Sequence, residues 1–458
     1  MSTILAVGLV GYASAADYYV AKTGDDSDGL TWKTAWHTIG QGIGSCSGAP
    51  ADTVNVALGT YVENVTLKSY VTLQGGYDGE TIIDGNAAGS VVTVWQLTSV
   101  TIDGFTITNG LGSAGGGVSW FKASGAINGC TITRNTASQS GGGIFCATSS
   151  PLISKCTISG NTANYVGSGG GGIKCNDRSS PKIVDCDISG NTSVGTGGGV
   201  FCSSGSSPTL ANCTICDNTA PWAGGICIYP DRSGITIQSC TISENIADSY
   251  GAIYCGTTSR ASVINSIFWG NGPGQVVGTV TITYSCIEGG WKGSGNIKAD
   301  PLFASGPLGD YYLSQTAVDG KQPQSPCADT GSDSAANLAL GTYYTTRTDE
   351  KCDGGKVDMG YHYESSCVGG NNPPTARIVS ITPSRPTKGQ EVHFVGSGAD
   401  SDGTIEAWLW ISSLDGDFGY ASDCYCSTLR VGKHTISFKV MDDDGDWSAP
   451  ATKTLTIR

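Results

Sequence analysis

Charged side chains are scarce in this 458-residue chain. Asp, Glu, Lys and Arg make up 14% of it, with 39 acidic against 25 basic residues, about half the usual share. The net charge of −14 leaves no positive field to collect phosphates, which excludes a basic nucleic-acid-binding protein. Because 39% of the residues are hydrophobic, the chain can bury a core, which excludes intrinsic disorder.

Long apolar runs are also lacking. Beyond the first residues, no segment offers the roughly 20 apolar residues of a membrane helix. Residues 1–15 are apolar and end in Ala13-x-Ala15, the pattern of a secretory signal at its cleavage site. A buried strand is the alternative, and no Lys or Arg precedes the run, as expected if the start is truncated or misassigned. We expect an extracellular protein, secreted or held at a cell surface, without a transmembrane segment.

Glycine and cysteine, in contrast, are abundant, with 68 and 18 copies. Gly, Ser, Thr and Val oppose helix formation, and the glycines lack the strict three-residue period of collagen. The cysteines are in keeping with export but do not prove it. The composition therefore predicts a β-rich, turn-rich chain of two or more domains.

Internal repeats predict the fold. The phrase Cys-x-Ile-x-x-Asn recurs, and successive asparagines lie 26 to 30 residues apart at Asn135, Asn161, Asn191, Asn218, Asn245 and Asn271. A second phrase, Gly-Gly-Ile-x-Cys with variations, alternates with it from Gly142 to Cys255. Several short strands per period predict a parallel β-helix, in which strands of successive rungs pair about 4.8 Å apart. A leucine-rich or propeller array is the alternative, but its Leu or Trp-Asp signature is missing.

Strand alternation assigns the faces of each rung. Cys156 and Ile158 are predicted to point inward, and Thr157 and Ser159 outward. Stacking then forms a cysteine column (Cys130, Cys156, Cys186, Cys213, Cys240) and an isoleucine column (Ile132, Ile158, Ile188, Ile215, Ile242). We expect the asparagines at a corner, bonded from rung to rung, and the glycines at corners that need a positive φ.

These residues resemble two known families. The repeats over about residues 100–272 are similar to those of polymorphic outer membrane proteins, which implies a right-handed β-helix of the pectate-lyase-like superfamily. Residues 375–458, with Gly398-Ala-Asp-Ser-Asp-Gly403 and Trp408-Leu-Trp410, resemble a polycystic-kidney-disease (PKD) domain, which implies an immunoglobulin-like β-sandwich with an accessory role. Thr31–Ile39 and Val357–Tyr361 look like the opening and closing segments of secreted β-helix proteins, the former with a short helix that plugs the first rung with Ala35, Ile39 and Ile43.

The predicted fold class is all-β, a right-handed parallel β-helix solenoid followed by a small immunoglobulin-like β-sandwich. The predicted segments are a signal peptide at 1–15, an N-terminal cap at 16–52, β-helix rungs at 53–272, last rungs and C-terminal cap at 273–364, a linker at 365–374 and the PKD-like sandwich at 375–458.

Candidates for acid–base chemistry are few. Asp185 and Asp187 share a face but gain no carboxylates on neighbouring rungs. Asp177-Arg178 and Asp231-Arg232 follow the third strand two rungs apart and could line a polar groove, although solvated loops are the alternative. None of these residues forms a recognisable general acid–base pair, and the four histidines are scattered over the caps and the sandwich.

Aromatic side chains are the better candidates for ligand binding. Phe145, Phe201 and Tyr254 are predicted to form an outward column with Lys174, and Tyr165, Trp222 and Tyr250 occupy equivalent loop positions. Such a row could stack sugar rings, or its members could merely stack on one another.

Two further sites are predicted. Inward cysteines can remain buried thiols, form disulfides between rungs or bind metal. Cys216 and Cys227 both replace outward residues of the same rung, and we predict a disulfide between them. In the sandwich, Asp400, Asp402, Asp442, Asp443, Asp444 and Asp446 could bind Ca²⁺, or they could be solvated turns.

Three functions are compatible with these patterns. The first is a secreted or cell-surface, adhesin-like scaffold that binds glycans or proteins without catalysis. The second is a polysaccharide-active lyase, glycoside hydrolase or epimerase with an accessory module, and the third is a structural component of an extracellular sheath. Binding without turnover would favour the first function, release of products the second, and self-assembly the third.

Overall fold

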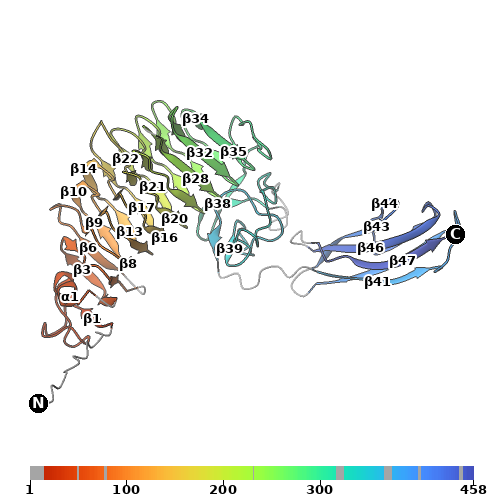
Figure 1. Ribbon diagram of the computed structural model, residues 1–458, viewed down its shortest axis with the longest axis horizontal. Coiled ribbons are helices and arrows are strands. Elements are labelled where there is room, and N and C mark those ends of the chain that lie inside the picture. The colour runs from red at the N-terminus through yellow and green to blue at the C-terminus, as the bar shows by residue number, and fades with distance from the viewer. Residues whose placement is uncertain are drawn as a thin grey trace, which may run out of the picture. The chain divides into compact units, whose positions relative to one another are not determined.

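The computed structural model describes residues 15–48, 51–76, 80–230, 232–315, 324–365, 374–400, 404–442 and 447–458. They form an all-β structure, in which a right-handed β-solenoid of about eight turns is followed by small antiparallel sheets (Figure 1). The chain divides into two compact units, residues 1–301 with 359–361 and residues 302–358 with 362–458. The predicted fold class is confirmed.

Four parallel sheets build the solenoid. Sheet A, in spatial order, contains β1 (Asp17–Val20), β2 (Asp52–Val56), β5 (Val71–Gln74), β8 (Val100–Asp103), β12 (Gly125–Asn128), β16 (Leu152–Ser154), β20 (Lys182–Val184), β24 (Thr209–Ala211), β28 (Gly234–Gln238), β32 (Arg260–Ile264) and β35 (Val280–Thr283). Sheet B contains β3 (Gly59–Val62), β6 (Thr81–Asp84), β9 (Thr106–Thr108), β13 (Thr131–Thr133), β17 (Thr157–Ser159), β21 (Asp187–Ser189), β25 (Thr214–Cys216), β29 (Thr241–Ser243), β33 (Ile267–Trp269) and β36 (Cys286–Ile287).

The other two sheets complete each turn. Sheet C contains β4 (Val65–Thr66), β7 (Val92–Trp95), β11 (Val118–Phe121), β15 (Ile144–Ala147), β19 (Ile173–Asn176), β23 (Val200–Cys202), β27 (Ile226–Ile228), β31 (Ile253–Cys255) and β34 (Val276–Gly278). Sheet D contains β10 (Leu111–Ala114), β14 (Thr136–Ser140), β18 (Thr162–Ala163), β22 (Thr192–Ser193), β26 (Thr219–Ala220) and β30 (Ile246–Ala247). A complete rung therefore runs through sheets A, B, D and C in that order.

Neighbouring rungs pair in register. Ile132 pairs with Ile158, and the same register continues through Ile188 to Ile242. These isoleucines are fully buried in one continuous core, together with the predicted cysteine column. The predicted inward columns are confirmed.

The repeated asparagines form a buried ladder. From Asn135 to Asn245, each amide Nδ2 donates a hydrogen bond to Oδ1 of the asparagine on the next rung, over 2.8 to 3.0 Å. The same Nδ2 atoms also donate to backbone carbonyls inside the solenoid, such as that of Ile107. The rung-to-rung bonding predicted for these residues is present.

The glycines have two roles rather than the single one expected. Gly141 and Gly170 have φ angles of 66° and 77°, as expected for corners. Gly142 and Gly171 do not need a positive φ, but a Cβ on either would lie 2.5 Å from a backbone oxygen of the next rung. The expectation of positive φ is therefore wrong for these residues, which are glycine because two backbones approach closely.

The N-terminal end of the solenoid is closed by a short helix, α1 (Ile39–Ser45). Thr38 and Gln41 form a capping box at its start, and Ile39 and Ile43 pack into the solenoid core. Ala35 is buried but precedes the helix. β1, which lies in the segment predicted as the cap, is the first strand of sheet A.

Beyond the last rung, the described residues within 302–358 and 362–364 form a loop-rich segment with two hairpins. Its strands are β37 (Phe303–Gly306), β38 (Gly309–Leu313), β39 (Tyr344–Thr345) and β40 (Tyr363–Glu364). Residues 359–361 belong to the solenoid unit, where the backbone N–H of Gly360 donates to Asn265 O and that of Tyr361 donates to Thr241 Oγ1.

The C-terminal domain is an antiparallel β-sandwich. One sheet has the order β41 (Thr375–Thr382), β42 (Val392–Ala399) and β45 (Asp423–Cys426), and the other β44 (Gly416–Gly419), β43 (Ile405–Ser412), β46 (Gly432–Asp442) and β47 (Ala451–Ile457). Phe394 of the first sheet packs with Trp410 and Phe438 of the second.

Among the described residues, no helix is long and apolar enough to cross a membrane.

Candidate functional site

The outer face of sheet C carries a column of aromatic side chains. Strand pairing places Phe145 beside Lys174, Lys174 beside Phe201, Phe201 beside Cys227, and Cys227 beside Tyr254. This is the order expected from the repeats, with Cys227 in the position where neighbouring rungs have an aromatic residue or Lys174.

The loops between sheets D and C add aromatic rings at one end of this column. Trp222 and Tyr250 both contact Tyr254, with ring centroids 5.7 and 5.1 Å away. Phe201 and Cys227 lie buried in a small cluster with Ala223, against which Tyr254 packs. Among the residues predicted to form a row, Tyr165 is exposed and stacks on no other ring within the described residues.

Lys174 is buried in the middle of the column. Its Nζ donates to Ser168 Oγ at 2.5 Å and lies 4.4 Å from the ring centroid of Phe201. Burial lowers the pKa of this amine to about 8, because the charged form is desolvated. The side chain is thus part of the packed surface and is poorly placed to reach a ligand.

A second outward column runs beside the first. Trp95 stacks on Phe121 with centroids 4.2 Å apart, and Tyr229 contacts Tyr254 further along. Between Phe121 and Tyr229 the column has only small or polar side chains, including Ala147, which is buried, and Asn176, which is half-buried. Trp95 and Tyr229 are 54% and 49% exposed, so their rings are open to a ligand.

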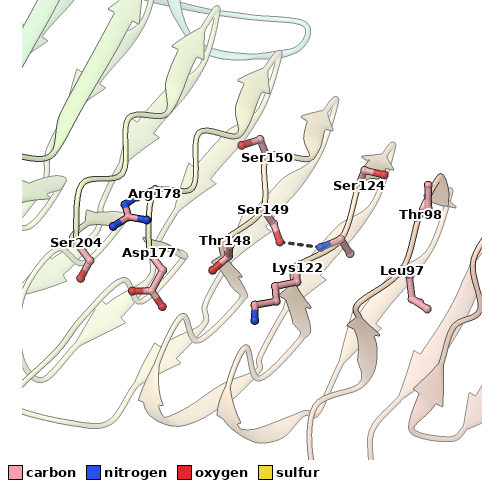
Figure 2. A pocket seen from close by; sticks show the side chains of 11 residues that line it. Leu97, Thr98, Lys122, Ser124, Thr148, Ser149, Ser150, Asp177, Arg178 and Ser204 are labelled. Carbon is pink, nitrogen blue, oxygen red and sulfur yellow. Dashed lines mark hydrogen bonds between the residues drawn. The ribbon is translucent and has the colours of Figure 1, made fainter.

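A groove of about 770 Å³ follows this second column at the corner between sheets C and A (Figure 2). Its lining is mostly polar and comprises Leu97, Thr98, Lys122, Ala123, Ser124, Thr148, Ser149, Ser150, Asp177, Arg178 and Ser204. A neighbouring groove of about 470 Å³ is lined in part by Arg232 and Arg260. Asp231 lies outside the described residues.

A ladder of serines supports this corner. Ser149 Oγ accepts a hydrogen bond from Ala123 N at 3.1 Å, and Ser179 Oγ accepts one from Ser149 N at 3.2 Å. Ser206 Oγ accepts the next one, from Ser179 N. These serines are buried, which fixes the backbone that carries the exposed groove residues. Neither this ladder nor Lys122 was predicted from the sequence, although Ser recurs at the matching point of each period.

The carboxylates of Asp185 and Asp187 accept hydrogen bonds from other side chains of the solenoid. Asp185 accepts a hydrogen bond from Asn212 Nδ2 at 2.8 Å. Asp187 accepts from Thr214 Oγ1 and Ser189 Oγ, both at 2.6 Å. The structure therefore separates these two residues from the groove that contains Asp177 and Arg178, and ties them to neighbouring side chains.

The structure also tests the predicted cysteine bridge. Cys216 and Cys227 are both thiols, and Cys216 Sγ donates to Asp187 Oδ1 at 3.9 Å on sheet B, whereas Cys227 lies in the cluster on sheet C. The prediction of a Cys216–Cys227 disulfide is wrong for this structure, because the two side chains point outward from different sheets.

The cysteine columns are buried thiol ladders. Cys130 Sγ and Cys156 Sγ each donate to a carbonyl of their own rung at 3.2 Å, and burial and neighbouring thiols raise the pKa of both well above the usual value. A second ladder, Cys146, Cys175 and Cys202, lies on the inner face of sheet C. No metal-binding group of three or more His, Cys, Asp or Glu occurs among the described residues. Cys352 is in a disulfide.

The predicted calcium site lies mostly outside the described residues. Asp402, Asp443, Asp444 and Asp446 are not described, and the structure places only Asp400 at the end of β42 and Asp442 at the end of β46. The site stays a prediction.

One cluster of titratable groups was not foreseen. In the segment after the solenoid, His362 Nε2 lies 2.8 Å from Asp353 Oδ2, and Asp358 accepts hydrogen bonds from Asp329 N and Thr346 Oγ1. Burial and the nearby Asp353 raise the pKa of Asp358 to about 7. These groups are buried, so they can stabilise the fold but are closed to a polymeric substrate.

Comparison with known protein families supports the fold of the solenoid. The family model of the right-handed β-helix region matches residues 90–268, and no curated protein matches. The surface adhesin PfbA of Streptococcus pneumoniae is 12% identical over 60% of this chain and 79% of that one, with a TM-score of 0.42. The PKD1 domain of the Vibrio cholerae metalloprotease PrtV is 24% identical over 19% of this chain and 98% of that one, with a TM-score of 0.16.

A structure of carbohydrate-binding modules from the β-sandwich superfamily is 22% identical over 19% of this chain, with a TM-score of 0.18. The chain covers 35% of that structure. Likenesses this distant assign no activity to the chain.

Proposed function

We propose that this protein is an extracellular, non-catalytic scaffold that binds a glycan chain along the outer face of sheet C and the adjoining corner groove. The C-terminal sandwich is, in this proposal, an accessory module of the PKD type. The observation that carries the proposal is the second outward column, where the exposed rings of Trp95 and Tyr229 bracket a stretch of small side chains beside a polar groove.

The chemistry of this surface suits a sugar polymer. The apolar face of a sugar ring packs against an aromatic ring, and the hydroxyls of Thr148, Ser150 and Ser204 can bond with sugar hydroxyls. The regular rise between rungs repeats such contacts along a chain. A short peptide would gain less here, because the sheet has no free edge on this face for strand pairing.

Binding without turnover is favoured over catalysis. Glycoside hydrolysis needs two carboxyl groups on either side of the scissile bond. Among the described residues that line the two grooves, Asp177 is the single carboxylate. Asp185 and Asp187 are occupied by bonds to neighbouring rungs.

A glycan array probed with the full chain tests the proposal. We expect binding to a subset of linear glycans, weakened about tenfold by Trp95→Ala or Tyr229→Ala, since each substitution removes a stacking surface. Tyr420→Ala, which removes an exposed ring from the sandwich, is the matched control. Mass spectrometry of the same glycans after incubation checks for cleavage, and released products would contradict the non-catalytic proposal.

A further inference from the structure

We propose that the corner groove selects a linear polysaccharide that carries an anionic group on every second sugar. This inference rests on the proposed function, glycan binding at the same corner, and deepens it by naming the class of ligand. It comes from the placement of cations that the repeats do not require.

The cations recur on alternate rungs. Lys122 follows β11, Arg178 follows β19 and Arg232 follows β27, and in sheet C a single strand separates each of these strands from the next. Since rungs are about 4.8 Å apart, successive cations are separated along the axis by about 10 Å. The turns after the intervening strands, β15 and β23, supply Thr148 and Ser204 instead.

These cations are available to a ligand. Lys122, Arg178 and Arg232 are exposed, and in the part of the chain that the structure describes none of them is in an ion pair. Lys122 Nζ lies 5.1 Å from the ring centroid of Phe121, a contact that leaves its charge exposed. Asp177 adjoins Arg178 in sequence, but Figure 2 shows its carboxylate and the guanidinium pointing in different directions. Arg260, which starts β32 (Arg260–Ile264) on the rung directly after that of Arg232, lies outside the alternate-rung row and adds a cation at its end.

The folded chain gains little from this arrangement. Exposed charges contribute little to stability even when they are paired, and among the described residues these cations form no ion pair, on one corner of a chain whose net charge is −14. A cationic row within an acidic protein attracts an anionic ligand to this corner and repels it elsewhere.

The spacing identifies the ligand class. In an extended polysaccharide, each sugar advances the chain by about the rise of one rung, so cations on alternate rungs meet anionic groups on alternate sugars. The hydroxyls of Thr148 and Ser204 then face the uncharged sugars between them. A polymer of alternating uronate and N-acetylhexosamine has this pattern, whereas a neutral polymer leaves the cations without partners and a polyuronate places every second carboxylate against a hydroxyl.

Titration calorimetry with the full chain and three octasaccharides tests the inference. The probes are hyaluronan, with a carboxylate on every second sugar, chito-octaose, which is neutral, and oligogalacturonate, with a carboxylate on every sugar. We expect hyaluronan to bind most tightly and its affinity to fall as salt is raised.

The charge variants make the test specific. Lys122→Gln, Arg178→Gln and Arg232→Gln should each weaken hyaluronan binding about two- to fivefold and reduce its salt dependence, whereas Arg134→Gln should change neither. Arg134 is a matched control, because it is exposed, has a positive φ like Lys122 and Arg178, and lies after sheet B rather than sheet C.

Two outcomes would overturn the inference alone. In the first, chito-octaose or oligogalacturonate binds as tightly as hyaluronan. In the second, the substitutions to Gln leave the affinity for hyaluronan unchanged. In both cases, loss of binding in Trp95→Ala would leave the proposed function standing. If none of the glycans on the array or in the calorimeter binds, both proposals fail.

Discussion

Asn191 Oδ1 accepts two hydrogen bonds from Asn161, one from its backbone N–H and one from Nδ2, both over 3.0 Å. Asn191 in turn donates to Asn218 Oδ1 and to the carbonyl of Ile158. One fully buried side chain therefore satisfies polar groups on the rung before it and the rung after it.

Replacing this residue should be costly. Asn191→Ala leaves buried donors and acceptors without partners, at about 1–3 kcal/mol each, so we expect the unfolding free energy to fall by about 3–6 kcal/mol. Chemical denaturation followed by circular dichroism measures the change. Asn64→Ala is the control, because Asn64 makes one exposed bond, to Ser90 O, and a similar loss there would contradict a special role for the ladder.

Lys174 should destabilise the fold at neutral pH. Its folded-state pKa of about 8 lies below the usual 10.5, so burying the charge costs free energy below pH 8, and this cost disappears as the pH rises towards 10.5. We expect Lys174→Met to raise the unfolding free energy at pH 7 by up to about 3 kcal/mol, less whatever the lost contacts with Ser168 and Phe201 contributed.

The pH dependence of stability distinguishes removal of the buried charge from an improvement in packing by the Met side chain. The stability difference between Lys174→Met and the unchanged protein should narrow between pH 8 and pH 10, and a difference that stays constant would refute the charge argument. Lys182→Met, at an exposed position of β20, should have little effect at either pH.

The buried carboxyl group of Asp358 should make the stability of the protein depend on pH between about pH 4 and pH 7. Because the pKa of Asp358 is about 7 in the folded protein, against an ordinary value of 3.8, the folded state retains a proton that the unfolded state loses. Its stabilising contribution is full below about pH 4 and is lost as the pH rises through 7.

The substitution Asp358→Asn keeps a side-chain oxygen that can accept the hydrogen bond from Asp329 N, and it removes the titrating carboxyl group. We expect the melting temperature of the variant to fall less than that of the unchanged protein between pH 4 and pH 8. Parallel melting curves across this range for the two proteins would show that Asp358 is not the group responsible.

The cysteines should behave as protected thiols. The sixteen thiols that the structure describes are buried except for Cys424, which is partly exposed, and buried thiols with raised pKa values react slowly. Iodoacetamide should label Cys424 first in the folded protein and all sixteen after unfolding without a reductant. Peptide mapping that found Cys216 linked to Cys227 would restore the disulfide prediction.

The repeats contain most of the information about the solenoid. Alternation within a strand is a local rule, so the inward positions of Cys156 and Ile158 follow directly from the sequence. The Asn ladder follows as well, because a polar side chain recurring at a fixed place in a buried stack needs its own copies as partners.

The corners are harder to predict, because turns of different length connect similar strands. Lys122 directly follows its strand, whereas Arg178 and Arg232 come two and four residues after theirs, which conceals their common position. The predicted disulfide between Cys216 and Cys227 is absent for a related reason. Their outward orientation was predictable, but the short strand β26 turns the chain between them, so they belong to different sheets.

The constant rise of the rungs makes the solenoid a molecular ruler. Each rung bonds only to its two neighbours, so a whole rung can be inserted or removed while the others keep their contacts. Such a change would lengthen or shorten the outer face of sheet C by about 4.8 Å without altering the side chains that remain. Under the proposed function, the length of glycan that the protein can span is therefore set by how many rungs its gene encodes, independently of what each rung recognises.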